Sequence, residues 1–369
     1  MSEGEKNDRY QRQILLKDFG EVAQKKLQQA KILIIGAGGL GCPALQYLCA
    51  AGVGKIGVID FDRVELSNLH RQILFSMEDI GKLKAEVAAE KLKKLNPDCE
   101  IIPYPLELNT KNALELIKDY DLVLDGSDNF PTRYLVNDAC VLLDKPLVYG
   151  AVLAFEGQVA VFNIPDKKTG IKTSYRDLFP IPPDPANSPS CNEAGVIGVI
   201  PGIIGCMQAA EAIKIICGLG EILSNKIISY SALNNTYYDF EIQTKDKSGF
   251  DYPKTKSEFL NFDYAWHCSA AGSELDIAAF EALNKNKDWL VIDVRESGEL
   301  PVVTEFNHIQ IPLSNFENAL PEIRTNKSIL LFCKSGTRSL KALRILKIKF
   351  PQTMAFSLKG GIDKLKQKN

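Results

Sequence analysis

Short apolar runs alternate with longer amphipathic segments over the first 150 residues of the chain. The runs predict strands, because a strand that is buried on both faces reads as a continuous apolar stretch. The longer segments carry apolar residues at helical spacing and predict helices. The predicted strands are residues 31–35, 55–59, 122–124 and 147–150, and the predicted helices are residues 43–51 and 82–95. Strands that alternate with helices indicate an α/β fold with a doubly wound, Rossmann-like sheet.

This pattern is interrupted twice and then restarts. Residues 163–192 are rich in proline and polar residues, which predicts a long mobile loop. Residues 243–258 are charged and nearly free of aliphatic side chains, which is typical of a linker. The later segments predict strands at 289–294, 329–333 and 354–358 and a helix at 339–350. We therefore expect a first domain over 1–242, a linker over 243–270 and a small α/β domain over 271–369.

Composition and charge narrow the class of protein. Hydrophobic residues make up 45% and charged residues 24% of the 369 residues, as in a globular protein. A net charge of −2 gives no reason to expect a nucleic-acid or membrane partner. The polar start predicts no signal peptide, and the uncharged run 194–210 is short for a membrane span, so we expect a buried segment. Nine cysteines without an export signal indicate reduced thiols and a cytoplasmic protein.

A glycine-rich turn lies between the first predicted strand and the first predicted helix. It contains Gly36, Gly38, Gly39 and Gly41, and Asp60 ends the next strand. Glycines let backbone N–H groups approach a phosphate closely, and an aspartate at that position can bind a ribose hydroxyl. Alone, this pattern favours a dinucleotide-dependent dehydrogenase about as much as a protein that uses ATP.

Charged side chains after the next strands separate these two alternatives. The stretch 60–72 reads DFDRVELSNLHRQ, Lys84 begins a predicted helix, and Asp128 and Asn129 follow another strand. The carboxyl ends of parallel strands meet at one edge of a sheet, so we expect these groups to gather there. Arginine and lysine neutralise phosphoryl oxygens, and a carboxylate can hold Mg²⁺. The set therefore favours a nucleoside triphosphate with Mg²⁺ over a nicotinamide.

These motifs resemble the ubiquitin-activating-type adenylyltransferases of prokaryotic sulfur-carrier pathways, which serve molybdopterin synthase and thiamine synthesis. The similarity covers about residues 8–242. It implies that ATP and Mg²⁺ bind at Gly36, Gly38, Gly39, Gly41, Asp60, Asp62, Ser67, Asn68, Leu69, His70, Arg71, Gln72, Lys84, Asp128 and Asn129. Asp128 would hold the Mg²⁺ ion that accompanies ATP. Arg12 resembles an arginine that reaches the phosphates of the partner protomer in a homodimer.

The resemblance also implies the reaction. The carboxylate of a Gly-Gly tail on a ubiquitin-like sulfur carrier attacks the α-phosphate of ATP and gives an acyl-adenylate and pyrophosphate. Arg12, Arg71 and Lys84 would offset the charge at the transferring phosphorus. The small subunit of molybdopterin synthase is the first expectation for the carrier, and a carrier of the thiamine pathway or another sulfur carrier is the alternative.

Cysteine spacing departs from the family pattern. Most relatives carry two Cys-x-x-Cys pairs for a structural zinc ion, and no two cysteines here have that spacing, so we expect no structural zinc. Cys191 stands where relatives have either a thioester- or disulfide-forming cysteine or a dispensable one. A catalytic role and an inert buried thiol therefore both remain open for Cys191.

A second motif begins at Cys333, between an apolar strand and a predicted helix. A cysteine there faces backbone N–H groups, a helix amino end and cations, which favour the thiolate. The loop residues that follow it are Lys334, Ser335, Gly336, Thr337, Arg338 and Ser339. With the motifs at 293–296 and 358–361, this loop resembles that of a rhodanese domain. Four residues separate Cys333 from Arg338, one fewer than in the related cysteine phosphatases, which favours a persulfide on Cys333.

Together the two sites predict an ATP-dependent adenylyltransferase fused to a sulfurtransferase. Its expected partners are the sulfur carrier, a persulfide donor such as a cysteine desulfurase, and a second copy of the chain. Two alternatives come from other classes of protein. A nicotinamide-dependent oxidoreductase would explain Asp60 but leaves Arg71 and Lys84 without a role. A non-catalytic sulfur-relay scaffold would need Cys333 but not Lys84.

Overall fold

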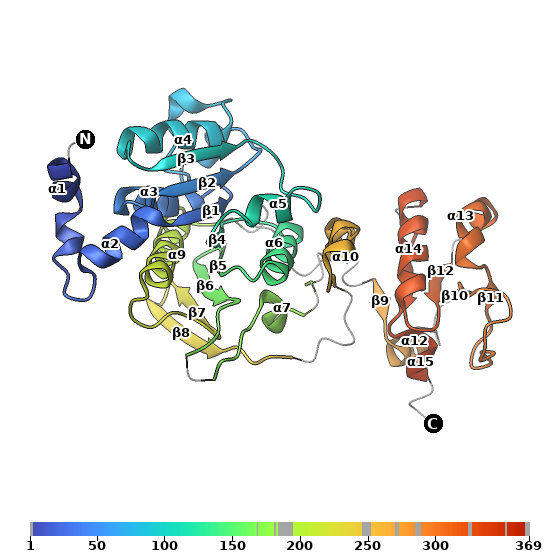
Figure 1. Cartoon of the computed structure of the whole chain (residues 1–369). Helices are drawn as coiled ribbons and strands as arrows, with labels where there is room; N and C mark the ends of the chain where they lie inside the picture. Colours follow the sequence, from blue (N-terminus) through green and yellow to red (C-terminus); the bar gives the residue numbers. More distant parts are fainter. Residues whose placement is uncertain are drawn as a thin grey trace. The chain divides into compact units, whose positions relative to one another are not determined.

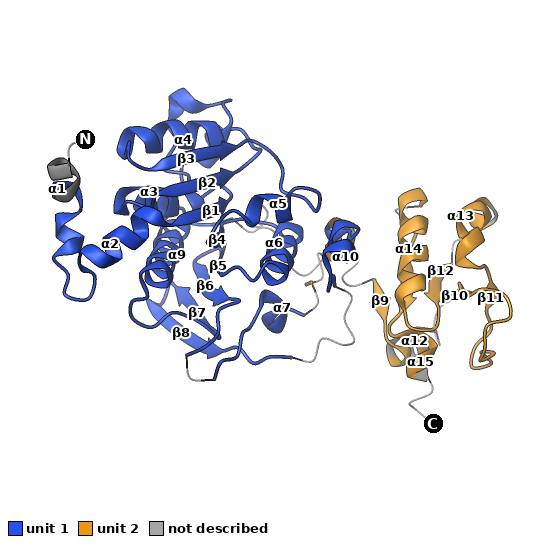
Figure 2. Ribbon diagram, viewed as in Figure 1, with its two compact units in different colours: residues 1–181, 189–264 blue, residues 182–188, 265–369 orange. Residues whose placement is uncertain are grey.

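The chain forms two compact units in a computed structural model. The model describes residues 3–167, 169–180, 182–183, 195–245, 252–269, 273–284, 289–323, 327–350 and 353–365. The first unit comprises Met1–Ile181 and Pro189–Tyr264, and the second comprises Pro182–Ser188 and Ala265–Asn369 (Figures 1 and 2). Each unit has its own sheet and its own hydrophobic core, and each is considered by itself.

An eight-stranded sheet with the order β3-β2-β1-β4-β5-β6-β7-β8 organises the first unit. Its strands are β1 (Lys31–Ile35), β2 (Lys55–Ile59), β3 (Glu100–Tyr104), β4 (Leu122–Asp125), β5 (Leu147–Leu153), β6 (Glu156–Phe162), β7 (Lys226–Ser231) and β8 (Thr236–Glu241). The strands β1 to β5 pair in parallel, which confirms the predicted Rossmann-like fold. The antiparallel half, β6 to β8, was not predicted.

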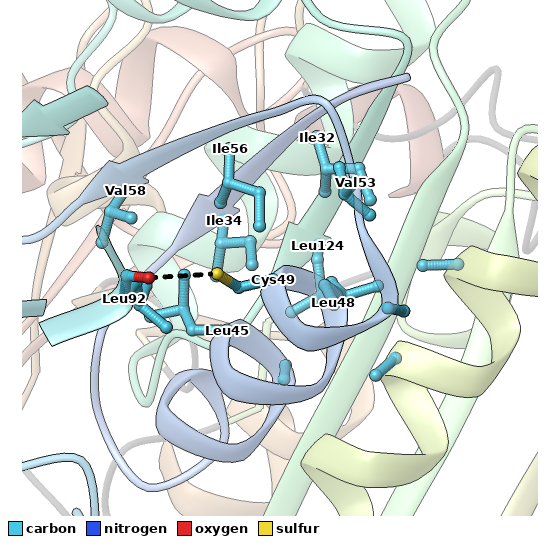
Figure 3. Close-up of a cluster of buried hydrophobic side chains, with 14 of the residues drawn as sticks. Ile32, Ile34, Leu45, Leu48, Cys49, Val53, Ile56, Val58, Leu92 and Leu124 are labelled. Atoms are coloured by element: carbon cyan, nitrogen blue, oxygen red, sulfur yellow. Dashed lines mark hydrogen bonds between the residues drawn. The ribbon is translucent and has the colours of Figure 1, made fainter. Parts of the chain in front are cut away.

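Helices pack on both faces of this sheet. They are α1 (Glu3–Ile14), α2 (Gly20–Gln29), α3 (Gly41–Ala51), α4 (Lys84–Leu95), α5 (Ala113–Ile117), α6 (Phe130–Leu142), α7 (Tyr175–Leu178), α9 (Val199–Cys217) and α10 (Lys256–Leu260). On one face, Ile32 and Ile34 of β1 join a core with Leu45 of α3 and Leu92 of α4 (Figure 3). Burying each such side chain contributes about 1.5–3 kcal/mol. On the other face, Leu33 lies with Tyr120 beside Gly57.

The apolar helix α9 covers the middle of the sheet. Among the described residues it is the one helix that could cross a membrane by length and composition. Its Ile204 and Gln208 are buried, and Gln208 Nε2 donates to Asp125 O at 2.7 Å. A buried amide that bonds to a strand end is typical of a core helix, because an unbonded amide there would destabilise the fold. The prediction of a buried segment at 194–210 is therefore confirmed from Ile200 onwards, whereas Ile197 and Val199 before it are exposed.

The predicted mobile loop at 163–192 is wrong for its first part. Residues 175–178 form α7, and Arg176 makes a buried ion pair with Asp138 of α6. The guanidinium Nε and Nη2 each lie 2.8 Å from a carboxylate oxygen of Asp138, and the ring of Tyr134 lies 4.7 Å away. Such a pair tolerates burial because its hydrogen bonds are made. Residues 184–194, including Cys191, lie outside the described residues.

Part of the segment predicted as a linker also folds onto the first unit. Phe259 of α10 is buried, and the hydroxyl of Tyr264 donates to Asp138 Oδ2 at 2.8 Å. The ring of Tyr252 lies 5.3 Å from the Arg176 guanidinium. Aromatic side chains hold this segment, so its lack of aliphatic residues is a poor guide to its structure. The first unit thus extends to Tyr264, whereas the sequence places its boundary after residue 242.

A five-stranded parallel sheet with the order β11-β10-β12-β13-β9 organises the second unit. Its strands are β9 (Glu274–Leu275), β10 (Trp289–Asp293), β11 (Ile309–Gln310), β12 (Ser328–Phe332) and β13 (Ala355–Leu358). Its helices are α12 (Ile277–Asn284), α13 (Phe316–Ala319), α14 (Thr337–Lys349) and α15 (Gly361–Leu365), and α11 (Tyr264–Ser269) runs into it from the last residue of the first unit. The three predicted strands and the predicted helix are confirmed. The two-residue strands β9 and β11 are too short to leave a pattern in the sequence.

Candidate active sites

The glycine-rich turn lies where the strand order of the first sheet reverses. Such a reversal opens a crevice at the carboxyl ends of the neighbouring strands, here β1 and β4. Gly36 has a φ of +90°, and a Cβ atom there would lie 2.9 Å from Gly126 O. A Cβ atom on Gly41 would lie 2.0 Å from Gly36 O. Only glycine therefore allows the turns after β1 and β4 to approach so closely.

Backbone N–H groups hold the carboxylate of Asp60 at the end of β2. Its Oδ2 accepts from Ala37 N and its Oδ1 from Asp62 N, each at 2.8 Å. Burial raises the pKa of Asp60, and nearby Lys84 and the two N–H groups oppose that rise. A carboxylate has lone pairs beyond these two bonds. Asp60 can therefore also accept a hydrogen bond from a ribose hydroxyl.

Lys84 begins α4 and carries a nearly buried ammonium group. Residues 62–64 lie beside residues 82–84, and Lys84 N donates to Asp62 O at 2.9 Å. The side chain of Lys84 is 6% exposed, and its Nζ lies 3.0 Å from Asp62 Oδ2. The Asp62 side chain is 54% exposed, so solvent reaches that pair from one side. An ammonium fixed in this way is a point charge suited to a phosphate.

Arg71 extends from a tight turn that packs on the amino end of α9. Its Nη1 donates to Ser67 O at 3.0 Å and to His70 Nε2 at 2.8 Å. A Cβ atom on Gly39 would lie 3.6 Å from Arg71 Cγ and 2.9 Å from Pro201 Cβ. The structure thus brings Arg71 against the glycine-rich turn, as the sequence predicts.

Other residues of this turn have structural contacts. Asn68 Oδ1 accepts from Glu65 N at 3.3 Å, and Leu69 packs against the core. Gln72 is buried, and its Oε1 has no hydrogen-bond partner in the described structure. Its Nε2 would lie 3.8 Å from a Cβ atom on Gly38. A buried amide oxygen without a partner beside the glycine-rich turn could accept a hydrogen bond from a bound ligand.

Asp128 and Asn129 follow β4, and the start of their loop lies against Gly36. Asn129 caps α6, since its Oδ1 accepts from Thr132 N at 2.9 Å. Asp128 is exposed. Within the described ranges, no group of three or more His, Cys, Asp or Glu residues could hold a metal ion. One exposed carboxylate fits a Mg²⁺ ion whose other ligands are phosphate oxygens and water.

Two buried polar residues under this loop were not predicted. Arg133 Nη2 donates to Ser127 O at 3.3 Å, and its guanidinium lies 5.6 Å from the centre of the Tyr149 ring. Burial raises the pKa of Asp125, and the charge of Arg133 opposes that rise. Gln208 binds the backbone oxygen of the same Asp125. Polar residues that stand between apolar ones in α6 and α9 were the signal that could have found both.

Arg12 is exposed on α1, and no described contact joins it to the crevice. Its neighbours hold the helix in place. Tyr10 Oη accepts from Asn96 Nδ2 at 2.8 Å, and Gln13 Nε2 donates to Ala51 O at 2.9 Å. The helix therefore presents Arg12 to the outside of the chain.

In the second unit, Cys333 follows β12 at the base of its loop and is fully buried. Its Sγ accepts from Gly336 N at 3.2 Å, and Ser339 Oγ lies 3.6 Å away. Gly336 has a φ of +95°, and a Cβ atom on Gly361 would lie 2.4 Å from Cys333 O. Among the described contacts one backbone N–H donates to the sulfur, whereas the sequence predicts several.

The arginines of this region are already paired with carboxylates. Arg338 Nη2 lies 2.7 Å from Glu299 Oε2, and Nη1 bonds the other carboxylate oxygen. Arg295 Nη2 lies 2.6 Å from Asp293 Oδ2. Lys334 is exposed. The cations predicted beside Cys333 are therefore present, but Glu299, which the sequence did not single out, neutralises Arg338.

The Arg338–Glu299 pair predicts a loss of stability in acid. The hydrogen bond from Arg338 lowers the pKa of Glu299 from 4.5 to about 2. Such a carboxylate contributes stability that is complete above its unfolded pKa of 4.5 and is lost as the pH falls towards about 2. Because these side chains are 31% and 30% exposed, we expect Glu299→Gln to cost no more than about 1 kcal/mol at pH 7.

Thermal unfolding followed by tryptophan fluorescence checks this expectation. Trp289 of β10 is buried in the core of the second unit, so its fluorescence reports that unit. The difference between the parent and Glu299→Gln should stay constant from pH 7 to about 5 and shrink between about pH 4.5 and 3. Glu305→Gln, an exposed change nearby, serves as the control. A difference that does not shrink in acid would show that the charge of Glu299 is not what stabilises the loop.

Comparison with known proteins gives the family of both units. Residues 10–251 match the ThiF family, and residues 276–368 match the rhodanese-like domain. The chain is 41% identical to the probable adenylyltransferase/sulfurtransferase MoeZ of Mycobacterium tuberculosis, over 96% of this chain and 91% of MoeZ. It is 38% identical to the adenylyltransferase and sulfurtransferase MOCS3 of Drosophila yakuba, over 96% of this chain and 82% of that protein.

The first unit has further relatives of its own. It is 53% identical to the sulfur carrier protein adenylyltransferase of Thermus thermophilus, over 63% of this chain and 86% of the relative. A crystal structure of E. coli MccB with ATP has a TM-score of 0.56 and 25% identity, over 65% of this chain and 72% of MccB. The resemblance inferred from the motifs is thereby confirmed. The chain belongs to the ThiF family of adenylyltransferases and carries a rhodanese-like sulfurtransferase domain after its ThiF domain.

Proposed function

We propose that the protein adenylates the C-terminal glycine of a ubiquitin-like sulfur carrier and then replaces AMP by sulfur from a persulfide on Cys333. The observation that carries this proposal is that one chain holds two sites. Asp60, which senses the charge of Lys84, and Arg71 both lie against the glycine-rich turn of the first unit, and a buried cysteine lies in a rhodanese-like loop of the second. MoeZ and MOCS3, which match nearly the whole chain, bear both activities in their names. The small subunit of molybdopterin synthase is the first candidate carrier, and a thiamine-pathway or other carrier is the alternative.

ATP fits the residues of the crevice. The glycine-rich turn admits phosphates, Asp60 keeps lone pairs for the ribose, and the unsatisfied Gln72 Oε1 offers a buried acceptor. Lys84 and Arg71 supply positive charge for the phosphates. Asp128 would hold Mg²⁺, which neutralises phosphate charge when it is bound.

In the first half-reaction the carrier carboxylate attacks the α-phosphorus of ATP. An oxygen–phosphorus bond forms, the bond to the bridging oxygen of the β-phosphate breaks, and pyrophosphate leaves with the electron pair. No proton transfer is needed, because the carboxylate is already ionised. Arg71 and Lys84 hold the phosphates in line and offset the charge that develops on their oxygens.

In the second half-reaction the outer sulfur of the Cys333 persulfide attacks the acyl carbon, and AMP leaves. The product is an acyl disulfide between the carrier and Cys333. A second thiol then attacks the Cys333 sulfur, which releases the carrier thiocarboxylate and leaves a disulfide. Cys191 is the candidate for that thiol in this chain, and an external thiol is the alternative. A thiol reductant finally returns Cys333 to the thiolate, and a persulfide donor such as a cysteine desulfurase reloads it.

A homodimer would bring Arg12 of one protomer to the phosphates held by the other. Arg12 is exposed beside Leu15, Leu16 and Val22, which are 73%, 60% and 70% exposed. Apolar exposure of this extent is typical of an interface. Mixing two inactive variants, Arg12→Ala and Lys84→Ala, should therefore restore about a quarter of the sites by subunit exchange. Activity that stays absent after proven exchange would rule out a contribution of Arg12 across the dimer.

Exchange of labelled pyrophosphate into ATP tests the first half-reaction. We expect exchange only when a carrier with an intact Gly-Gly terminus is added, and the same carrier without its last two residues is the control. NAD binding without such exchange would favour the oxidoreductase. Sulfur transfer from Cys333 without any ATP dependence would favour the relay scaffold.

A further inference from the structure

Two buried hydroxyl groups lie beside the sulfur of Cys333. Ser339 belongs to the first turn of α14 and Ser357 belongs to β13, and neither they nor Cys333 have any exposed surface. Ser339 Oγ lies 3.6 Å from Cys333 Sγ and 2.8 Å from Ser357 Oγ. The three side chains therefore form a row inside the second unit, where polar interactions are stronger than in water.

The Ser339 hydroxyl has one proton, and two atoms besides Ser357 Oγ can accept it. Its Oγ lies 2.9 Å from Gly336 O as well as 3.6 Å from the sulfur. Gly336 O also accepts from Leu340 N at 3.0 Å, so it stays satisfied when Ser339 turns away. A hydroxyl donates once and accepts twice, so Ser357 can donate to Ser339 in both orientations. The Ser339 hydroxyl can thus donate to Cys333 Sγ when the sulfur carries a negative charge and to Gly336 O when it does not.

A packing role alone does not explain a serine at position 357. Its neighbours on β13 are Phe356 and Leu358, and Leu331 is its partner on β12. Burying a hydroxyl in such surroundings destabilises a fold unless the hydroxyl is hydrogen-bonded. Among the described contacts, the side-chain bond of Ser357 is the one to Ser339.

We propose that Ser357 and Ser339 form a hydroxyl relay that stabilises the thiolate of Cys333. Ser339 donates to the reacting sulfur, and Ser357 is a positioning residue that acts through Ser339. The inference rests on the proposed function in that Cys333 accepts sulfur: its thiolate attacks the sulfane sulfur of a donor persulfide, the donor S–S bond breaks, and the donor thiolate leaves. The charge then lies on the outer sulfur, and Ser339 turns back to Gly336 O.

The rate of alkylation of Cys333 by iodoacetamide tests the relay in the full-length protein. Mass spectrometry of the Cys333 peptide separates it from the other cysteines. Ser357→Val and Ser357→Thr have the same shape and differ by the hydroxyl. At pH 6.5 we expect alkylation to slow about tenfold or more in Ser339→Ala and about threefold or more in Ser357→Val, with Ser357→Thr near the parent. At pH 10 we expect the rates of all variants to converge, because a strongly alkaline solution removes the advantage of a hydrogen bond to the thiolate.

Ser328→Ala is the matched control, because Ser328 begins β12, the strand that Cys333 follows, and its hydroxyl is 3.3 Å from another sulfur, that of Met354. It should have the parent profile. Equal rates for Ser357→Val and Ser357→Thr at pH 6.5 would overturn the role of Ser357. Slowing that is the same at pH 6.5 and pH 10 would show a change of access and overturn the relay.

A separate measurement shows whether the proposed function fails while the relay is correct. Alkylation needs neither a carrier nor a persulfide, so it reports the relay alone. Loading of sulfur from cysteine persulfide onto the parent protein is measured beside it. If the parent takes up no sulfur while the alkylation rates differ as expected, the relay stands and the sulfur role of Cys333 fails.

Discussion

Cys333→Ala is expected to abolish thiocarboxylate formation and to leave adenylation of the carrier unchanged. The sulfur atom carries the persulfide, and no other group of its loop can replace it as a nucleophile. Cys333 belongs to the second unit, while the residues proposed to bind the nucleotide, Asp60, Arg71 and Lys84, belong to the first. Pyrophosphate exchange at the parental rate together with no detectable thiocarboxylate is therefore the expected result, measured by the intact mass of the carrier.

A matched variant controls for the loss of a thiol. Cys206→Ala removes a partly exposed cysteine of α9 that takes no part in either site, and it should form thiocarboxylate like the parent. If Cys333→Ala still produced thiocarboxylate from a persulfide donor, sulfur would reach the acyl-adenylate without Cys333. The second half-reaction would then need another sulfur carrier.

Lys84→Ala is expected to lower carrier-dependent pyrophosphate exchange by about 10²–10³-fold, as for the loss of one fixed charge at a developing transition state. The ammonium is nearly buried beside Asp62, so its position is set before ATP arrives. After the truncation Asp62 remains, and because it is half exposed, water can solvate it and the fold should tolerate the change.

Lys82→Ala is the control for this variant. Lys82 lies two residues earlier, and its side chain is 56% exposed and 3.7 Å from Asp79. Its loss should change exchange by less than about twofold, as for an exposed surface pair. Loading of sulfur onto Cys333 should be unchanged in both variants. An exchange rate in Lys84→Ala close to the parental rate would remove Lys84 from the phosphate site.

The sequence predicts the parallel half of the first sheet well, because strands buried on both faces read as apolar runs such as residues 31–35. The antiparallel half was missed because its edge strand β8 (Thr236–Glu241) is exposed along nearly its whole length and has no alternation. The order around residues 171–180 was missed for another reason. It depends on the pairing of Arg176 with Asp138, two charged residues that lie far apart in the sequence.

The residues of the candidate sites also fall into a group that the sequence predicts and a group that it does not. Local motifs predict the glycine-rich turn, Lys84 and the Cys333 loop, since each depends on residues close together in the chain. Glu299 and Ser357 were not predicted, because each lies far in the sequence from the loop residue that it contacts. Glu299 is 39 positions from Arg338, and Ser357 is 18 positions from Ser339. A glutamate in a polar loop and a serine in a short strand have no pattern that marks them.

Linking the two units in one chain raises the effective concentration of Cys333 for the second half-reaction. A tethered domain has a high effective concentration near its target, provided that the tether can span the distance. Tyr264 is held on the first unit by Asp138, so the tether begins there and not at residue 242. The second unit thus remains attached to the chain that makes the acyl-adenylate.

The intact mass of the carrier is the most direct test of the central claim. Each candidate carrier with a Gly-Gly terminus is incubated with the protein, ATP, Mg²⁺, a persulfide donor and a thiol reductant. The account predicts that one carrier gains about 16 Da, as oxygen is replaced by sulfur in its terminal carboxylate. Unmodified carriers with continued pyrophosphate release would contradict the sulfur role of Cys333. Unmodified carriers without pyrophosphate release would contradict the proposed substrate class.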